Sequence, residues 1–179
     1  RSTNVETAQL LALLVHAGVK TLAFTRTRRG AELVLRYTRT ALENTAGISA
    51  ARPATSPGGA VTEQQVAAYR AGYTVEDRRR LEQAFLSGEL RGLVSTNALE
   101  LGVDIGGVDA VVMGGFPGTI ASSWQQAGRA GRSQGDSLAV LVAQDDPLDQ
   151  FYMRHPVEFF SRSHEHARVA LDNPYILSD

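Results

Sequence analysis

Short apolar segments alternate with amphipathic segments along most of the chain, and this alternation is the feature that most constrains the fold. The apolar segments have the length of buried strands and lie at residues 20–25, 66–69, 91–96, 108–113 and 137–143. Segments with helical periodicity lie at residues 3–15, 29–42 and 75–86, and shorter ones begin near residues 122 and 147. This order predicts a mostly parallel central sheet with helices on both faces, which is a three-layer α/β domain. Ligands of such sheets bind beyond the carboxyl ends of the strands.

Local signals also predict where helices and loops begin. Thr3 and Glu6 have the spacing of a capping box, which predicts a helix that opens at Thr3. Ser122 or Ser123 is expected to open the short helix that follows the fourth strand. Residues 44–59 are rich in Ala, Ser, Pro and Gly, and they predict a loop or an insertion.

The composition is ordinary for a globular domain. Of the 179 residues, 43% are hydrophobic and 21% are charged, and none is cysteine. No apolar run is long enough to span a bilayer, and the amino-terminal segment lacks the order of a signal peptide. We therefore expect a cytoplasmic protein without a membrane partner, a disulfide or a thiolate metal site. Periodicity is lost after Phe160, so residues 1–160 are expected to form the domain and residues 161–179 a tail or linker.

The charge balance limits how the chain can bind nucleic acid. The net charge is -1, whereas a domain that grips nucleic acid by electrostatics alone is usually strongly basic. Any contact with nucleic acid should therefore be local or shared with another domain.

Residues 125–132, Gln-Gln-Ala-Gly-Arg-Ala-Gly-Arg, carry the strongest chemical signal. If they continue a helix, Gln125, Arg129 and Arg132 share one face, because residues three and four apart are neighbours there. Two guanidinium groups beside an amide suit a polyphosphate. Each glycine inside a helix would cost roughly 1 kcal/mol, so the glycines indicate a close backbone approach or the end of the helix. The competing interpretation is two surface arginines in ordinary ion pairs.

A second signal lies in residues 94–105, where an apolar strand ends in polar residues. Thr96 stands where this strand meets a helix, so its hydroxyl and the nearby amides could hold a phosphate. The alternative is that Thr96 only caps the helix and that Asp104 is a turn residue.

Two weaker signals also follow strands. Thr25 and Arg26 lie just past the carboxyl end of a strand, a position suited to a backbone phosphate. A solvated loop is the competing interpretation of this pair. Arg70 follows the strand at 66–69 and could bind phosphate in the same way.

Together these segments resemble the motifs of superfamily 2 helicases. Residues 125–132 resemble motif VI, residues 94–105 motif V and residues 21–32 motif IV. The resemblance implies a RecA-like fold and the second of two motor lobes. In that family the motif VI arginines reach the γ-phosphate of ATP held by the other lobe. Arg129 and Arg132 would thus be arginine fingers, with Gln125 beside them.

The resemblance also implies roles in DNA and nucleotide binding. The residues it assigns to the nucleic-acid backbone are Thr25, Arg26, Thr96 and Asn97. Gly102 and Asp104 would lie near the ribose of the nucleotide. Many relatives carry histidine where this chain has Arg70, so the role of that histidine does not transfer directly.

Two motifs of a complete ATPase are missing from the sequence. It contains no G-x-x-x-x-G-K-[ST] phosphate loop and no acidic tetrad of the D-E-x-H kind. ATP and Mg²⁺ are therefore expected to be bound mainly by the first lobe. We predict that this chain alone neither hydrolyses ATP nor unwinds a duplex.

Narrower features resemble the MrfA/SftH group of RecQ-related DNA helicases. They lie at residues 69–73, 123–132, 146–156 and 173–177. This resemblance implies 3′→5′ translocation on single-stranded DNA, a role in DNA repair, and a zinc domain with four cysteines beyond this lobe. No metal site is expected in the chain itself. Asp145, Asp146 and Asp149 are interpreted as acids at a helix N-terminus, where the helix dipole favours them.

Two other functions are compatible with the residues. One is a non-enzymatic nucleic-acid-binding or regulatory module built on a degenerate helicase lobe. The presence of both arginines argues against it, because a module freed from ATP would not need them. The other is a motor that moves on duplex DNA without separating strands.

Overall fold

The computed structural model describes residues 2–49, 63–70, 72–100, 103–131, 136–163 and 165, and its centre is a five-stranded sheet. The strands are β1 (Thr21–Thr25), β2 (Val66–Tyr69), β3 (Gly92–Ser95), β4 (Ala110–Gly114) and β5 (Leu138–Val142). Their order across the sheet is β2-β3-β1-β4-β5, and every neighbouring pair is parallel. All carboxyl ends therefore meet at one edge, the edge at which the sequence predicted the site.

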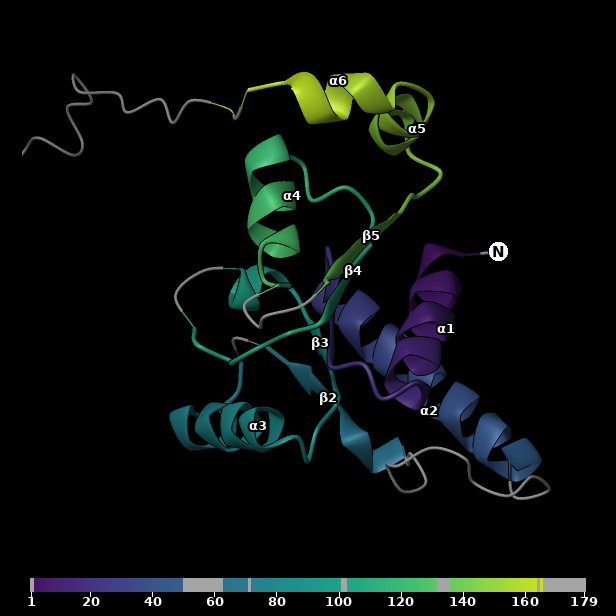
Figure 1. The fold of residues 1–179 in the computed structure, drawn as a ribbon, viewed down its shortest axis with the longest axis vertical. Coiled ribbons are helices and arrows are strands. Elements are labelled where there is room, and N and C mark those ends of the chain that lie inside the picture. Colours follow the sequence, from purple (N-terminus) through teal and green to yellow (C-terminus); the bar gives the residue numbers. More distant parts are fainter. Residues whose placement is uncertain are drawn as a thin grey trace, which may run out of the picture.

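Helices cover both faces of the sheet (Figure 1). On one face lie α1 (Thr3–His16) and α2 (Arg28–Ser49), and on the other α3 (Val75–Ser87), the 3-10 helix η2 (Asn97–Leu99) and α4 (Ile120–Ala127). Strand residues alternate between two cores: Ala23 packs with α1 and α2, whereas Leu22 and Phe24 pack with Phe85 of α3. The predicted three-layer α/β architecture is thus confirmed.

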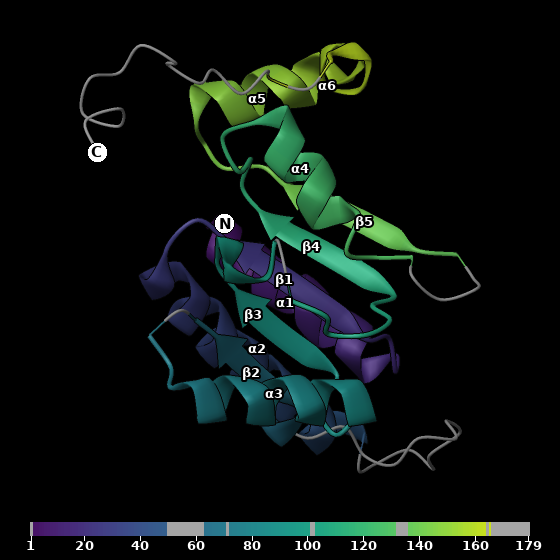
Figure 2. The same ribbon diagram turned by 90° about the vertical axis from the view of Figure 1, so that its left-hand side faces the viewer.

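A smaller layer lies beyond the carboxyl edge. It consists of α5 (Pro147–Arg154) and α6 (Pro156–Ser161), which stand above α4 in Figure 2. Phe116, Ile120 and Tyr152 are buried together, with Phe159 packed against them. The ring centroids of Phe116 and Tyr152 are 4.9 Å apart. This aromatic cluster joins α5 and α6 to α4 and thereby fixes the loop that enters α4.

One helix cap and two helix boundaries differ from the sequence predictions, whereas α1 begins at Thr3 as predicted. The N-cap of α1 is Ser2 and makes no side-chain cap bond, while the Thr3 hydroxyl donates to the carbonyl of Ala143 at 3.2 Å. The expected capping box is therefore wrong, because a tertiary partner takes its hydroxyl. The N-cap of α4 is Thr119, whose side chain accepts the amide of Ser122, so neither predicted serine opens this helix.

The third difference is the length of α2, which continues to Ser49. The predicted loop thus begins later than residue 44, because alanine and glutamate near that point favour helix. Residues 50–59 of the predicted loop and residues 164 and 166–179 of the predicted tail lie outside the described residues.

Two negative findings apply to the described part of the chain. There, no helix is long and apolar enough to cross a membrane. Within the same residues, no group of three or more metal-ligating side chains is found.

Candidate functional site

A hollow of about 240 Å³ opens at the carboxyl edge of the sheet. Its lining includes Thr25, Arg26, Asn97, Glu100, Ser122 and Gln126. Three segments that the sequence singled out therefore meet here: the turn after β1, the turn after β3, and α4. We call it the carboxyl-edge hollow.

The turn after β1 is fixed by its threonines. Thr25 is buried, and its hydroxyl lies 3.1 Å from the carbonyl of Thr27 and 3.4 Å from that of Ser95. The Thr27 side chain accepts the amide of Gly30 at 2.9 Å and so caps the start of α2. Thr25 therefore acts as a structural tie between β1 and β3, while the neighbouring backbone faces the hollow.

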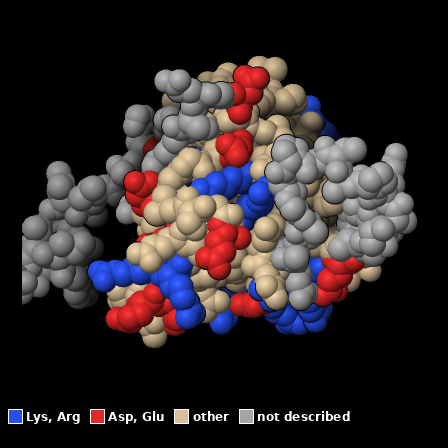
Figure 3. Space-filling view, turned by 60° about the horizontal axis from the view of Figure 1, so that its bottom comes forward, with Lys and Arg blue, Asp and Glu red and all other residues tan. Residues whose placement is uncertain are grey.

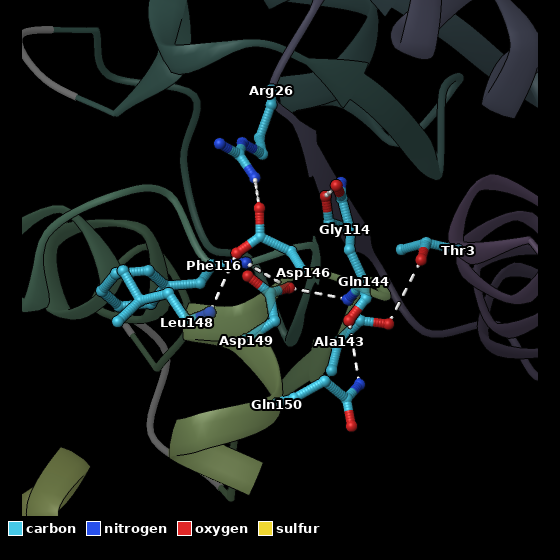
Figure 4. Close-up of polar contacts among 10 residues, drawn as sticks. All are labelled: Thr3, Arg26, Gly114, Phe116, Ala143, Gln144, Asp146, Leu148, Asp149 and Gln150. Atoms are coloured by element: carbon cyan, nitrogen blue, oxygen red, sulfur yellow. Dashed lines mark hydrogen bonds and ion pairs between the residues drawn. The ribbon is translucent and has the colours of Figure 1, made fainter.

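Arg26 stands on the outside of the same turn. Its side chain is 44% exposed, and its guanidinium lies 3.6 Å from the carboxylate of Asp146. Figure 4 shows the two side chains pointing toward each other across the edge of the sheet. A second hollow of about 490 Å³ adjoins this arginine and is lined by Arg29 and Gly30 from the first turn of α2. A helix N-terminus beside two guanidinium groups favours an anion.

The turn after β3 presents two polar residues. Thr96 occupies the N-cap position of η2, but its side chain makes no cap hydrogen bond. Asn97 is exposed and lines the carboxyl-edge hollow. The interpretation of Thr96 as only a helix cap is thus not supported, since its hydroxyl does not serve the helix.

Arg129 does not lie on a helix face with Gln125. Helix α4 ends at Ala127 with Gly128 as its C-cap, and Gln125 is exposed on that helix. A Cβ at position 128 would lie 3.0 Å from the carbonyl oxygen of Trp124, so a larger residue would be crowded at this point. The expected shared face is wrong for Arg129, and the alternative that the glycines end the helix is right.

The guanidinium of Arg129 is buried beneath the loop after η2. Arg129 is 7% exposed, and its Nε and Nη2 both donate to the carbonyl of Glu100, at 3.0 and 2.6 Å. Its Nη1 donates to the carbonyl of Val103 at 2.8 Å. The segment that follows is tied to the sheet, because Ala130 pairs with Val108 and Gly131 donates its amide to the Val108 carbonyl. Arg129 thus fastens the turn after β3 to the end of α4.

The other predicted site residues fall in three groups. Arg132 and Gly102 lie outside the described residues. Asp104 is exposed and accepts the amide of Gly106 at 3.0 Å, as the turn interpretation expected. Arg70 pairs with Glu32 at 2.8 Å and lies over the ring of Tyr73, away from the lining of the carboxyl-edge hollow.

Two residues of the hollow were not predicted from the sequence. Gln126 and Glu100 are 5% and 8% exposed, and the amide Nε2 of Gln126 donates to Oε2 of Glu100 at 3.0 Å. One signal was available, since Glu100 is a lone carboxylate between two leucines at a point where an apolar residue would pack more easily.

Asp149 was predicted only as an acid at the start of a helix. It is 1% exposed, and its Oδ2 accepts the amides of Phe116 at 3.1 Å and Gln144 at 2.7 Å. Figure 4 shows it between the ends of β4 and β5. Asp146 is the true N-cap of α5 and accepts the amide of Leu148 at 3.0 Å. Asp149 therefore holds the backbone that leads from the sheet into α4 and α5.

Charge is mixed around the described surface. In Figure 3 basic and acidic side chains alternate over the face shown, without an extended basic stripe among the residues coloured there. Beside Arg70, burial raises the pKa of Tyr69 to about 12, and its hydrogen bond to Glu82 at 2.7 Å acts in the same direction. Tyr69 is therefore a neutral donor near pH 7.

The domain is a parallel α/β fold with guanidinium, hydroxyl and amide groups at its carboxyl edge, and the comparisons assign it to a family. The chain belongs to the family of the helicase conserved C-terminal domain, whose model matches residues 5–134. It is the C-terminal RecA-like lobe of a helicase.

Individual relatives and solved structures show which helicases this chain is similar to. The chain is 41% identical over 179 residues to the ATP-dependent helicase YprA of Bacillus subtilis (strain 168), and it spans 22% of that protein. It matches the DUF1998 helicase MrfA bound to DNA and AMPPNP with a TM-score of 0.84 and 39% identity, covering 99% of this chain and 22% of MrfA. It also matches the Mycobacterium smegmatis helicase Lhr bound to ssDNA and AMP-PNP, with a TM-score of 0.69 and 29% identity over 90% of this chain and 20% of Lhr. The predicted resemblance to the MrfA/SftH group is thus confirmed.

Proposed function

We propose that this chain is the second motor lobe of an ATP-dependent 3′→5′ DNA helicase or translocase of superfamily 2 that acts in DNA repair. The observation that carries the proposal is the carboxyl-edge hollow, where the turn after β1, the turn after β3 and α4 come together. The DNA and nucleotide analogue bound to MrfA, and the ssDNA bound to Lhr, support the same partners for this chain.

ATP and Mg²⁺ would be bound mainly by a first lobe, because this sequence has no phosphate loop. Arg129 and Arg132 would supply positive charge to the γ-phosphate when the lobes close, with Gln125 on the exposed face of α4 beside them. Gly102 and Asp104 would approach the ribose. A zinc ion would belong only to a domain outside this chain, and the protein would work in the cytoplasm.

The burial of Arg129 sets a condition on its proposed role. A phosphate oxygen would reach the guanidinium on closure beside, or in exchange for, one of its carbonyl partners. A charged phosphate is a stronger acceptor than a neutral carbonyl, so this exchange is favourable once ATP arrives. The carbonyls would hold the side chain in place until then.

Single-stranded DNA would lie along the carboxyl edge of the sheet. Thr96 and Asn97 would contact its backbone directly, whereas Thr25 would contribute through the amides of its turn because its hydroxyl is committed. Arg26 would leave Asp146 to reach a phosphate, and Arg70 would leave Glu32. Both ion pairs are partly exposed, so exchanging them is inexpensive.

The test is DNA-stimulated ATP hydrolysis by the full-length helicase carrying Arg129→Ala or Arg132→Ala. We expect turnover to fall about 10³-fold, by analogy with other arginine fingers, while ATP binding is mostly retained. Arg79→Ala is the matched control, since this arginine lies exposed on α3. Unchanged turnover in both finger variants would refute the assignment.

A second measurement separates the motor from the alternatives. The 179-residue chain alone should hydrolyse no ATP, because it lacks the phosphate loop. A full-length protein with no DNA-stimulated hydrolysis would instead favour the non-enzymatic module. A full-length protein that hydrolyses ATP and moves on duplex DNA without separating strands would favour the third function.

A further inference from the structure

Glu100 makes four hydrogen bonds to three different residues. Its backbone amide donates to the carbonyl of Asn97 at 3.0 Å. Its carbonyl accepts two bonds from the guanidinium of Arg129. Its side-chain Oε2 accepts the amide of Gln126 at 3.0 Å. One residue thus contacts the turn that faces the carboxyl-edge hollow, the buried arginine and α4.

The pair that Glu100 forms with Gln126 is costly to maintain as packing alone. Glu100 is 8% exposed and follows Leu99, which is fully buried. A carboxylate in such a place loses much of its hydration, and an apolar residue of similar size would avoid that loss. We therefore infer that the hydrogen bond between Glu100 and Gln126 serves to fix the position of these two residues, and does not only fill space in the core.

Position matters here because the pair fixes the carbonyl that holds Arg129. Gln126 projects from the last turn of α4, just before its C-cap Gly128. If η2 shifts relative to α4, the Glu100 carbonyl shifts with it, and so does the guanidinium bound there. The same η2 begins at Asn97, which lines the hollow.

We propose that Glu100 and Gln126 form a positioning pair that couples DNA at Asn97 to the placement of Arg129, so that the pair sets how strongly DNA stimulates ATP hydrolysis. The inference rests on the function proposed above and assigns it a mechanism of regulation. Neither side chain touches ATP or DNA in this account. Both act through Arg129 and are positioning residues.

The experiment measures turnover of the full-length helicase with and without single-stranded DNA, and takes the ratio. Gln126→Glu replaces the hydrogen bond with two carboxylates that face each other. Glu100→Ala removes the carboxylate that accepts the bond from Gln126. We expect each variant to lower the ratio about tenfold, the value of one charge-assisted hydrogen bond. The swapped pair Glu100→Gln with Gln126→Glu rebuilds the bond in reverse and should restore the ratio to within about twofold.

A purely structural role gives a different result. In that case turnover with DNA and turnover without DNA fall together, the ratio stays at its wild-type value, and the inference is overturned. Failure of the swapped pair to restore the ratio, with both single variants low, also overturns it. Glu89→Gln is the control, because it removes an exposed carboxylate just beyond the end of α3.

The same experiment distinguishes failure of the proposed helicase function from failure of the positioning pair. If the wild-type helicase shows no stimulation by DNA, the proposed function fails before the pair is tested. If the wild type is stimulated and the variants keep its ratio, only the positioning pair fails. Thermal unfolding of each variant confirms that the comparison is made between folded proteins.

Discussion

Arg26 and Arg129 are both proposed to meet phosphate, yet the protein holds them in opposite ways. Arg26 is 44% exposed and has one ion pair at 3.6 Å. Arg129 is 7% exposed and donates three hydrogen bonds to backbone carbonyls. The first can change partner at little cost, whereas the second is part of the structure until something stronger competes for it. A contact that must form and break with each step suits the first arrangement, and a group that must be in place before catalysis suits the second.

The largest expected effect tests that contrast directly. Arg129→Ala should lower the free energy of unfolding of the 179-residue chain by about 3 kcal/mol, since it leaves buried carbonyls without donors. Arg26→Ala should change it by less than about 0.5 kcal/mol. Urea unfolding followed by circular dichroism measures both. Similar small losses for the two variants would remove the distinction drawn here.

Asp149 and Asp146 of the α5 region also differ in burial, and their substitution is expected to give the next largest effect. Asp149→Ala should cost about 2 kcal/mol, because one buried and one partly buried amide lose their acceptor. Asp146→Ala should cost about 1 kcal/mol, the value of a helix N-cap. The same unfolding measurement ranks them. A larger loss for Asp146 would contradict the burial argument.

A smaller effect is expected on DNA affinity. Asp146→Asn keeps a capping oxygen but removes the charge that faces Arg26, so it should tighten binding of single-stranded DNA by the full-length helicase about threefold at low salt. Arg26→Ala should weaken binding and reduce the salt slope by about 1. Fluorescence anisotropy over a salt series measures both. An unchanged affinity in Asp146→Asn would show that this ion pair does not compete with DNA.

The smallest effect concerns Tyr69, beside Arg70. Its pKa is raised from 10.0 to about 12, chiefly by burial, so the folded state favours the protonated phenol. Its contribution to stability is complete below pH 10 and declines as the pH rises from 10 toward 12. The difference in unfolding free energy between wild type and Tyr69→Phe should therefore shrink over that interval. A constant difference would mean that the phenol does not titrate there.

The strands of the sheet could be predicted from the sequence, because the run and alternation of apolar residues along a strand can be read from neighbouring positions. Ala23 and Leu22 face opposite cores simply because neighbouring strand residues alternate. The sequence was also sufficient to place Thr25, Arg26 and Asn97 at one edge, since all strands are parallel and their carboxyl ends coincide.

The sequence was not sufficient where a side chain's partner is distant along the chain. The Thr3 hydroxyl bonds to residue 143 and not to its own helix, and Arg129 finds its acceptors at residues 100 and 103. Gln126 and Glu100 are separated by 25 residues and adjoin only after the sheet has formed. The residue type of Arg129 predicted an affinity for phosphate. Its partners in this structure, the carbonyls of Glu100 and Val103, are set by the packing of distant segments.

An isolated parallel bridge between Ala130 and Val108 anchors the segment that follows α4 to the segment that enters β4. The amide of Gly131 reinforces it with a bond of 3.0 Å to the same residue. If Arg129 meets a nucleotide as proposed, a segment anchored in this way would bring it there only as far as the entire lobe rotates. The timing of ATP hydrolysis would then be governed by the hinge between lobes, and the stiffness of this small bridge would convert that rotation into a reproducible distance.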